Sequence, residues 1–372
     1  MRVLVLNCGS SSVKFAVIDT RSEESSVSGS VEEIGTSARF KAKKGGESFK
    51  RSVDAVNHSG ALAVVNSFLK EVGEDKGIAA VGHRVVHGGE KFSKSVLIND
   101  DVLKAIEECA VLAPLHNPPN LQGIAAAKKN FPELAQVAVF DTAFHRSIPD
   151  YAYLYGIPYW LYDEYKIRRY GFHGTSHRFV TKKTAALLGK KPEDLCLITA
   201  HLGNGCSATA VKFGESMDTT LGLTPLEGMV MGTRCGSIDP GIILHLTKTL
   251  GYDYEKLNKL LNKESGLLGL SKISSDMRVL LENADKGEER AKIAIEVFCY
   301  RAAKEIASLM PALPRLDILV FTGGIGENSE PVREKILSHL KIFKFGEGGP
   351  QVMVVPTNEE LLIAMDTEAV LK

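Results

Sequence analysis

The same local pattern occurs twice in this chain, nearly 200 residues apart. In each copy an apolar run leads into a polar turn and a second apolar run: residues 3–6, 7–12 and 13–18 in the first copy, and 195–200, 201–207 and 208–213 in the second. Aligning Gly205 with Gly9 gives an offset of 196 residues (205 − 9). Each copy predicts two strands joined by a tight turn, that is, a β-hairpin. Two such hairpins indicate a chain built from two related halves.

A second similarity between the halves supports this interpretation. Residues 137–142 (VAVFDT) are similar to residues 319–323 (LVFTG), with an offset of 181 residues between Val139 and Val320 (320 − 139). Two similar elements that recur in the same order favour an internal duplication over a chance match. The two segments are therefore expected to occupy equivalent places in the halves.

Length and charge exclude several classes of protein. The 372 residues suggest two domains, at about 150 residues per domain. Lys+Arg and Asp+Glu are equal at 45 each, which argues against a protein that coats nucleic acid or binds membrane surfaces. No apolar run is long enough to cross a membrane. The N-terminal sequence predicts a first strand rather than a signal peptide. We expect a cytoplasmic protein with no nucleic-acid or membrane partner.

Helical patterns with readable ends lie between the strands. Asp239-Pro240 predicts a helix that runs to Gly251, and residues 287–310 predict the longest helix. Asn328-Ser329 predicts the cap of another helix, directly after the glycines at 323–326. Strands that alternate with helices of this length indicate an α/β fold.

Two compositional features have simple interpretations. The polar segment 20–52 is expected to be an exposed meander or loop, with its basic run 39–44 on a solvated edge. The six cysteines include no CxxC pair, so neither a cysteine metal site nor a disulfide framework is expected.

The glycine-rich turns do not fit the common nucleotide motifs. No GxxxxGK[ST] segment occurs, which excludes a P-loop, and no GxGxxG follows a strand, which leaves a Rossmann dinucleotide site unsupported. One polar hairpin turn in each half and the glycines at 323–326 remain. Such turns expose backbone N–H groups to phosphate oxygens. Two hairpins from duplicated halves that grip a polyphosphate are typical of the actin-like ATPase fold.

Nine motifs, in order and spread over nearly the whole chain, resemble the acetate kinase family of the sugar kinase/Hsp70/actin superfamily. They are NCGSSSVK (7–14), GHRVVHGG (82–89), PLHNPPN (114–120), FDTAFH (140–145), RRYGFHGTSH (168–177), AHLGNG (200–205), MGTRCGSIDP (231–240), FTGGIGEN (321–328) and PTNEEL (356–361). The resemblance implies an α/β fold of two duplicated actin-like ATPase (ribonuclease H-like) domains with an interdomain active-site cleft. The implied first domain is 1–147 plus 360–372. The implied second domain, with the nucleotide site and the contacts of a homodimer, is 148–359.

The resemblance implies reversible, direct in-line transfer of the γ-phosphoryl group of ATP to acetate, giving acetyl phosphate and ADP. A carboxylate with a pKa of about 4 is ionised at neutral pH, so its oxygen needs no general base. Catalysis must therefore come from positioning and from stabilising charge on the moving phosphoryl group. The implied catalytic residues are Arg84, Asp141, His173 and Arg234.

By this resemblance each of the four has a role. Arg84 binds the substrate carboxylate or the phosphoryl group, since a planar guanidinium can form two parallel hydrogen bonds to either anion. Asp141, at the end of an apolar strand, orients Arg84 and helps to place Mg²⁺. His173 donates a hydrogen bond to the phosphoryl group in the transition state. Arg234, in a glycine-flanked loop, moves in as a second clamp when the cleft closes.

His173 and His177 are four residues apart, a spacing that also occurs in zinc sites. Gly174 and an N-cap at Thr175 would put His173 in the loop before the helix, which disfavours a zinc pair. His177 is expected to be structural instead, hydrogen-bonded near the start of that helix.

Metal and nucleotide ligands are also implied. Thr357 and Glu360 fit a capping box, which leaves Glu359 for Mg²⁺, with Mn²⁺ as the alternative ion. Asn7 is implied as the second residue of the metal site. The unfilled space around the glycines at 323–326 favours ATP over pyrophosphate. The residues implied in ATP or ADP binding are Lys14, His201, Leu202, Gly203, Asn204, Gly205, Asp276, Met277, Arg278, Gly324, Ile325, Gly326, Glu327 and Asn328.

Beyond Arg84, the implied acetate pocket is lined by Val86, Leu115, Phe172 and Pro225. Valine at 86, rather than alanine, favours acetate over propionate, although one or two methylenes are worth only about 1–3 kcal/mol of discrimination. Two positions depart from the family pattern. Ser237 stands where many relatives have aspartate, and Met365 replaces a polar or basic residue.

Three other functions stay open. A propionate or butyrate kinase would share the mechanism and differ in pocket volume. An actin- or Hsp70-like ATP-binding module would share the hairpin turns but has no use for the set Arg84, His173 and Arg234. A catalytically inactive regulator is the third alternative.

Overall fold

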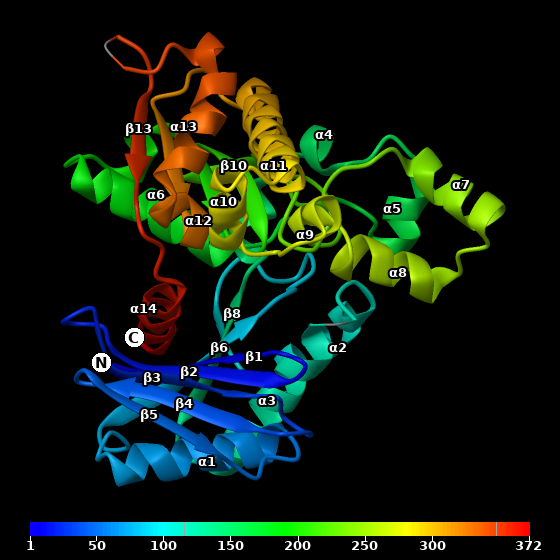
Figure 1. The fold of residues 1–372 in the computed structure, drawn as a ribbon. Coiled ribbons are helices and arrows are strands. Elements are labelled where there is room, and N and C mark those ends of the chain that lie inside the picture. The colour runs from blue at the N-terminus through cyan, green and yellow to red at the C-terminus, as the bar shows by residue number, and fades with distance from the viewer. Residues whose placement is uncertain (115, 347) are drawn as a thin grey trace. The chain divides into compact units, whose positions relative to one another are not determined.

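The computed structural model describes residues 1–114, 116–346 and 348–372, and the chain divides into two compact units (Figure 1). Unit 1 comprises Met1–Arg146 and Asn358–Lys372, and unit 2 comprises Ser147–Thr357. Glu359 therefore lies in unit 1, whereas the expected boundary put it in the second domain. The physical reason is that Asn358 caps the C-terminal helix, which packs on the sheet of unit 1.

An eight-stranded sheet forms the centre of unit 1, in the order β5-β4-β3-β2-β1-β6-β8-β7. Its strands are β1 (Arg2–Cys8), β2 (Ser12–Asp19), β3 (Glu24–Glu32), β4 (Arg39–Lys44), β5 (Glu47–Ser52), β6 (Ile78–Val85), β7 (Val96–Leu97) and β8 (Ala135–Phe140). β1 pairs antiparallel with β2 and parallel with β6, and β8 extends the parallel part. The predicted first hairpin is confirmed.

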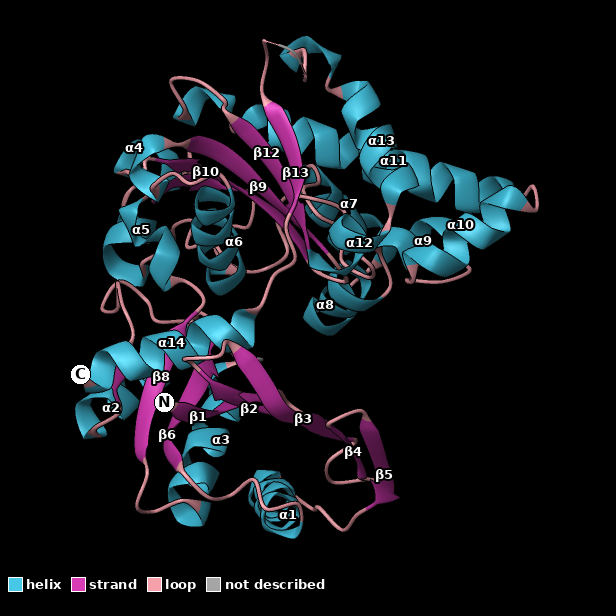
Figure 2. Cartoon of the chain, turned by 90° about the vertical axis from the view of Figure 1, so that its left-hand side faces the viewer, coloured by secondary structure: helices cyan, strands magenta, loops and turns pink. Residues whose placement is uncertain are grey.

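Helices cover both faces of this sheet (Figure 2). They are α1 (His58–Glu71), α2 (Asp100–Glu108), α3 (Asn117–Asn130) and α14 (Glu359–Leu371), with single turns at Cys109–Val111 and Ala143–Ser147. On one face the rings of Phe40 and Phe68 lie 4.8 Å apart in the main core. α14 packs on β1 and β6 so closely that a Cβ at Gly82 would collide with Thr367 and Ile363. This contact ties the C-terminal helix to the strand that carries Arg84.

Residues 20–52, expected as a meander or loop, form an ordered meander of the strands β3, β4 and β5. The basic run 39–44 is β4, which lies between β3 and β5, so its predicted place at the edge is wrong. Phe40 and Ala42 are buried, whereas Lys41 and Lys43 are exposed. Two apolar side chains at alternate positions are enough to give the strand a buried face.

Unit 2 contains a five-stranded sheet in the order β11-β10-β9-β12-β13. Its strands are β9 (Cys196–Leu202), β10 (Cys206–Lys212), β11 (Glu215–Thr219), β12 (Ile318–Thr322) and β13 (Gln351–Val354). Its helices are α4 (Asp150–Tyr153), α5 (Trp160–Tyr165), α6 (Gly174–Leu187), α7 (Pro240–Leu250), α8 (Tyr254–Lys263), α9 (Gly266–Ser271), α10 (Met277–Asp285), α11 (Glu289–Ser308), α12 (Gly323–Asn328) and α13 (Glu330–His339), with single turns at Pro192–Asp194, Met310–Ala312 and Lys341–Phe343.

The two sheets share one strand order, which supports the predicted duplication. The run β3-β2-β1-β6-β8 in unit 1 has the same antiparallel and parallel pairings as β11-β10-β9-β12-β13 in unit 2. β12 therefore corresponds to β6, since each is the parallel neighbour of the first hairpin strand. The expected equivalence of 137–142 with 319–323 is wrong, because 137–140 lies in β8, which corresponds to β13. Buried parallel strands share an apolar composition, and this alone makes their sequences similar.

Most predicted helix ends are confirmed. The side chain of Asp239 caps α7, which ends at Gly251, and α11 is the longest helix among the described residues. The glycines at 323–326 form the start of the short helix α12 rather than a turn before a helix, and a Cβ at Gly324 would still meet open space. Ser329 occupies the N-cap position of α13 but makes no capping hydrogen bond through its side chain. Of the helices in the described ranges, none is long and apolar enough to cross a membrane.

The predicted capping box at Thr357 and Glu360 is wrong. Asn358 is the N-cap of α14, and its Oδ1 accepts a hydrogen bond from the N–H of Leu361 at 2.9 Å. Thr357 interacts within unit 2 instead, where its N–H donates to Glu327 Oε1 at 3.1 Å. Its polar groups are therefore not available to the helix that follows.

Candidate functional site

Arg84 and Asp141 form an ion pair at the ends of two neighbouring strands of unit 1. β6 and β8 are parallel, so their carboxyl ends bring these residues to the same edge of the sheet. Arg84 Nη2 donates to Asp141 Oδ2 at 2.5 Å, and Arg84 Nε lies 3.1 Å from both carboxylate oxygens. Glu359, in the first turn of α14, lies 3.8 Å from Arg84 Nε. Three of the expected site residues thus meet in unit 1.

The electrostatic setting keeps Arg84 charged. Burial alone would lower the pKa of Arg84, but the carboxylates of Asp141 and then Glu359 more than compensate, so its pKa lies above the ordinary value. The side chain of Asp141 is 1% exposed and that of Arg84 is 21% exposed. One edge of the guanidinium is therefore fixed on a buried carboxylate, an arrangement that orients an arginine for anion binding.

Two buried asparagines, Asn117 and Asn120, to which the sequence analysis assigned no role, shape the segment after Arg84. Asn120 Oδ1 accepts from the N–H of Val86 at 3.0 Å, and its Nδ2 donates to the carbonyl of Cys8 at 2.8 Å. Asn117 bonds the N–H and the carbonyl of His87 in the same way. The motif PLHNPPN contains both residues. Their partners are backbone groups as far as 112 residues away, which spacing alone does not reveal.

The expected metal ligands Asn7 and Glu359 both lie in unit 1. Over the part of the chain that the structure describes, no group of three or more His, Cys, Asp and Glu side chains is arranged to hold a metal ion. The oxygen donors of Asn7, Asp141 and Glu359 nevertheless suit Mg²⁺, which binds through one or two carboxylates and completes its shell with waters and substrate phosphates. A site of this kind does not require a preformed cage.

In unit 2 a histidine pair lies at the second hairpin. His173 precedes α6 in the left-handed backbone region, with φ of 56°, and its Nδ1 is 2.9 Å from Ser207 Oγ. Its ring stacks on that of His201 with 4.6 Å between centroids. His201 Nδ1 is in turn 2.8 Å from Ser176 Oγ. These contacts fix both rings beside the turn between β9 and β10.

Arg234 reaches the same turn. A Cβ at Gly205 would lie 3.3 Å from His173 Nε2 and 3.6 Å from Arg234 Nη1, so the two side chains converge there. Arg234 Nη1 donates to the carbonyl of Pro225 at 3.0 Å. Burial lowers the pKa of Arg234, but the ordinary value is so high that the guanidinium stays charged at neutral pH. A cation and an imidazole therefore meet at the tip of the second hairpin.

His177 is structural, as predicted. It is buried, with Nδ1 2.7 Å from Thr199 Oγ1 and Nε2 2.7 Å from Ser207 Oγ. The predicted N-cap at Thr175 is wrong, because α6 begins at Gly174 and His173 occupies the N-cap position. His173 still precedes the helix, so the argument against a zinc pair holds.

A cavity of about 600 Å³ in unit 2 brings together residues of three segments expected to bind ATP or ADP, which we take as the site of the adenosine group. These segments lie far apart in the sequence, at the second hairpin, at the start of α10 and in α12. The lining residues are Gly203, Asn204, Ser275, Asp276, Met277, Arg278, Leu281, Gly324, Ile325, Asn328, Ser329 and Pro331. Asp276 caps α10 and pairs with Arg278 at 2.6 Å.

Some of the expected nucleotide residues lie elsewhere. Glu327 Oε1 accepts from the N–H groups of Gly323 and Thr357, so this side chain joins α12 to the end of unit 2 rather than lining the cavity. Leu202 is fully buried, and a Cβ at Gly326 would lie 3.6 Å from Leu202 Cβ. Neither Leu202 nor Gly326 lines the cavity.

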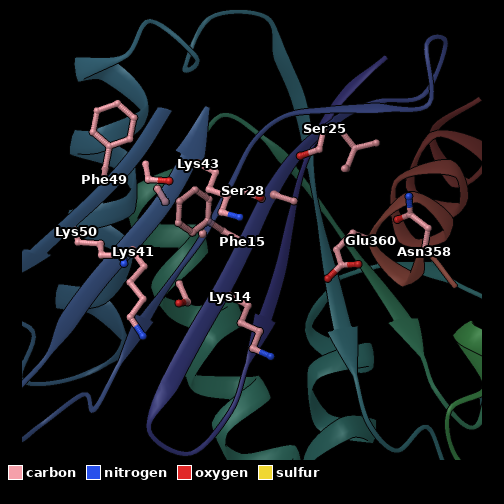
Figure 3. A pocket seen from close by; sticks show the side chains of 16 residues that line it. Lys14, Phe15, Ser25, Ser28, Lys41, Lys43, Phe49, Lys50, Asn358 and Glu360 are labelled. Carbon is pink, nitrogen blue, oxygen red and sulfur yellow. The ribbon is translucent and has the colours of Figure 1, made fainter. Parts of the chain in front are cut away.

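Lys14 lines another cavity, of about 570 Å³, in unit 1 (Figure 3). This cavity extends along β2 to β5 and includes Lys41, Lys43 and Lys50 on the sheet and Glu360 at the start of α14. Lys41 pairs with Glu32 at 2.8 Å. The expected place of Lys14 beside the nucleotide stays a prediction.

The expected pocket residues fall in both units. Val86 lies in unit 1 directly after β6, whereas Phe172, which is buried, and Pro225 lie in unit 2. Leu115 is outside the described residues. The roles of these four residues stay predictions.

Ser237 and Met365, which depart from the family pattern, lie in different environments. Ser237 Oγ accepts from the N–H of Gly228 at 3.0 Å, and the hydroxyl also contacts Glu305, whose pKa is raised by burial. An aspartate at 237 would bring a second carboxylate beside Glu305, so serine fits this position. Met365 is a partly exposed side chain of α14, and nothing in the structure explains it.

Comparison with known proteins identifies the family. The model of the acetokinase family matches residues 2–365. The acetate kinase of Shewanella amazonensis is 54% identical, over 98% of this chain and 97% of that protein. The chain belongs to the acetokinase family. The enzyme class expected from the motifs, a kinase with a carboxyl group as acceptor, is therefore confirmed.

Solved structures of acetokinase relatives confirm the fold. A propionate kinase from Francisella tularensis is 46% identical with a TM-score of 0.93, covering 98% of both chains. The acetate kinase of Porphyromonas gingivalis is 41% identical with a TM-score of 0.94, covering 100% of both chains. The duplicated α/β, actin-like fold expected from the two hairpins is thus the fold of this acetokinase.

Proposed function

We propose that this acetokinase catalyses the reversible transfer of the γ-phosphoryl group of ATP to acetate, giving acetyl phosphate and ADP. The observation that carries the proposal is the meeting of Arg234 and His173 at the turn of the second hairpin, in the unit that also contains the nucleoside-sized cavity. A module that only binds ATP has no need for a guanidinium and an imidazole at this turn. An inactive regulator would not need to retain both.

In the proposed mechanism the acetate carboxylate attacks the γ-phosphorus directly, without a general base. Arg84, oriented by Asp141, binds the carboxylate and holds one of its oxygens ready for attack. His173 and Arg234 donate hydrogen bonds to the phosphoryl oxygens as charge develops on them.

Mg²⁺ fits the oxygen donors of unit 1. Glu359 and Asn7 would hold it through water or phosphate, with Asp141 nearby, and Mn²⁺ could replace it. When bound, the ion neutralises charge on the phosphates of the nucleotide. Asp141 keeps its first task in this scheme, which is to orient Arg84 through two hydrogen-bonded oxygens.

A hydroxylamine-trapping assay tests the activity. Acetate, propionate and butyrate are each incubated with ATP and Mg²⁺, and the acyl phosphate is measured as its hydroxamate. Turnover that is fastest with acetate is the expected result. Turnover that is fastest with propionate or butyrate would leave the mechanism and overturn the substrate assignment. ATP binding without any acyl phosphate would move the protein to the binding-module class.

Propionate is the second candidate substrate, because a solved relative at 46% identity is a propionate kinase. Val86 is the residue we propose to discriminate between the two acids. We expect Val86→Ala to raise the ratio of kcat/KM for propionate to kcat/KM for acetate by about tenfold, since it makes room for one methylene. Val86→Ile should change the ratio in the opposite direction. A ratio that is the same in all three proteins would exclude Val86 from the pocket.

A homodimer through unit 2 is proposed as the assembly, in a cytoplasmic protein. α7 has the sequence PGIILHLTKTL, yet it has no buried residue, and Leu244 and Leu250 are 73% and 58% exposed. An apolar helix of this kind normally packs against a partner. Sedimentation should give a dimer for the wild type and a monomer for Leu244→Asp. Ile342→Asp, at another strongly exposed position of unit 2, serves as the control, and a dimer of Leu244→Asp would exclude this surface.

A further inference from the structure

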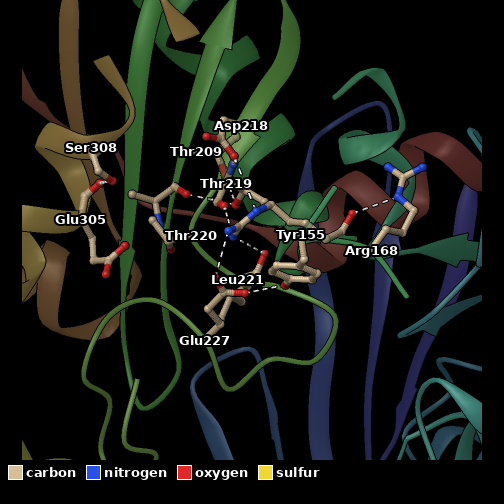
Figure 4. Close-up of polar contacts among 12 residues, drawn as sticks. Tyr155, Arg168, Thr209, Asp218, Thr219, Thr220, Leu221, Glu227, Glu305 and Ser308 are labelled. Atoms are coloured by element: carbon tan, nitrogen blue, oxygen red, sulfur yellow. Dashed lines mark hydrogen bonds and ion pairs between the residues drawn. The ribbon is translucent and has the colours of Figure 1, made fainter. Parts of the chain in front are cut away.

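A polar network in unit 2 joins three side chains that have no role in the mechanism above. They are Tyr155 and Glu227, which are labelled in Figure 4, and Arg169. The Tyr155 hydroxyl donates to Glu227 Oε2 at 2.5 Å, and Arg169 Nη2 donates to Glu227 Oε1 at 2.9 Å. Burial, followed by the nearby Glu227 carboxylate, raises the pKa of Tyr155, so the hydroxyl keeps its proton. Both oxygens of Glu227 therefore have fixed donors.

The same network holds the backbone of residues 219–223. Arg169 Nη1 donates to the carbonyl of Thr219 at 2.7 Å and to that of Leu221 at 3.2 Å. The Tyr155 hydroxyl also accepts from the N–H of Leu223 at 3.0 Å. A Cβ at Gly222 would overlap both the Glu227 carboxylate and the Tyr155 hydroxyl, so the backbone lies directly against the network.

Arg234 is hydrogen-bonded to the chain that follows residues 219–223. The carbonyl that accepts from Arg234 Nη1 belongs to Pro225, two residues before Glu227. On the other side of Glu227, Gly228 is bonded through its N–H to Ser237 Oγ and through its carbonyl to the N–H of Ser237, at 3.0 and 2.8 Å. The loop that carries Arg234 is therefore closed at both ends by polar contacts next to Glu227.

We propose that Glu227 is a positioning residue for phosphoryl transfer, which holds the Pro225 carbonyl in place and thereby directs the Arg234 guanidinium. The inference rests on the proposed function, in which Arg234 contacts the phosphoryl group, and it adds the element that orients this arginine. A shift of about 1 Å in such a group can cost about 100-fold in rate. Tyr155 and Arg169 each donate to one oxygen of Glu227 and thereby fix its carboxylate, in addition to their direct bonds to the backbone of residues 219–223.

Glu227→Gln is the first test. The amide keeps the shape of the carboxylate but removes its charge, so the ion pair with Arg169 is lost and the NH₂ group can only donate to the Tyr155 hydroxyl. We expect kcat to fall by about 10- to 100-fold. KM for ATP should stay within about twofold, because the cavity of residues 203–204, 275–281 and 324–331 does not include this network. Tyr155→Phe removes one donor and should produce a smaller fall in kcat.

A double variant separates positioning from a general loss of structure. If Glu227 acts through Arg234, Glu227→Gln should lower kcat no further in an Arg234→Ala background. Losses that multiply in the double variant would overturn the proposal. Asp218→Asn is the matched control, since Asp218 lies 3.8 Å from the same guanidinium of Arg169 but outside residues 219–237, and its kcat should match the wild type.

A second readout does not depend on turnover. Phenylglyoxal modifies arginine side chains, and peptide mass spectrometry can follow Arg234 alone. We expect Arg234 to react faster in Glu227→Gln than in the wild type or in Asp218→Asn, because its Pro225 contact is loosened. Equal reaction rates would overturn the inference even if the enzyme were active. An enzyme that forms no acyl phosphate but shows the faster labelling would contradict the proposed function alone.

Discussion

Arg234→Ala should lower kcat for acyl phosphate formation by about a thousandfold, which is the usual effect of losing an arginine that stabilises a transferring phosphoryl group. The residue lies with His173 at the turn of the second hairpin, where the phosphates of ATP are proposed to bind. Its guanidinium gains most of its interaction only as charge moves during transfer, so kcat should fall more than substrate affinity. Steady-state kinetics with saturating acetate and ATP measures this effect.

Nucleotide binding provides the control for Arg234→Ala. Arg234 is not among the residues that line the nucleoside-sized cavity of unit 2, so calorimetry should give nearly the same affinity for ADP as in the wild type. Arg315→Ala is a matched variant in unit 2, because Arg315 is half exposed and pairs with Asp317 far from the hairpin turn in sequence. Full activity is expected for it. A kcat for Arg234→Ala within tenfold of the wild type would refute its role in transfer.

Arg84→Ala is expected to damage both activity and stability. We expect kcat/KM for acetate to fall by about 100- to 1,000-fold, the range for loss of a fixed charged donor. The carboxylate of Asp141, only 1% exposed, would remain without its main cation, and breaking a buried pair in this way costs about 3–5 kcal/mol. The melting temperature should therefore fall together with the activity, as calorimetry would show.

A second substitution distinguishes these two effects. In Arg84→Ala with Asp141→Ala the uncompensated carboxylate is gone, so the melting temperature should recover in part while the activity stays low. Arg2→Ala is the matched control in the same unit, because Arg2 pairs with Glu74 away from Arg84 in the sheet and should leave kcat/KM unchanged. A stable Arg84→Ala with normal acetate kinetics would contradict both the ion pair and its function.

Local features could be predicted well because their causes lie within a few residues. The hairpins at Asn7–Ser12 and His201–Ser207 combine apolar alternation with a polar turn, and both form. Asp239-Pro240 and Gly251 mark the ends of α7 by their own backbone preferences. The family motifs at 200–205 and 321–328 contribute to two of the three segments that line the cavity of unit 2, whereas residues 276–278 lie outside the nine motifs.

The predictions were wrong where the role of a segment depends on residues that are far away in the sequence. Residues 137–142 and 319–323 have similar sequences. The pairing of β6 with β1 and of β12 with β9, however, decides which strands are equivalent. Thr357 fits a capping box by spacing, yet its N–H donates to Glu327, which is 30 residues away. The sequence of one segment does not reveal that Glu327 competes with Glu360 for the N–H of Thr357.

The sequence alone determined the α/β class, the duplication and the family. It also identified residues that can bind a carboxylate and a polyphosphate. These properties follow from local periodicity and from residue types in continuous motifs. Only the tertiary structure decided that Glu359 joins Arg84 in unit 1, that one cavity brings together three segments expected to bind the nucleotide, and that Glu227 lies beside Tyr155 and Arg169. The last contacts span 72 and 58 residues, and only the packing of the folded chain brings such groups within hydrogen-bond distance.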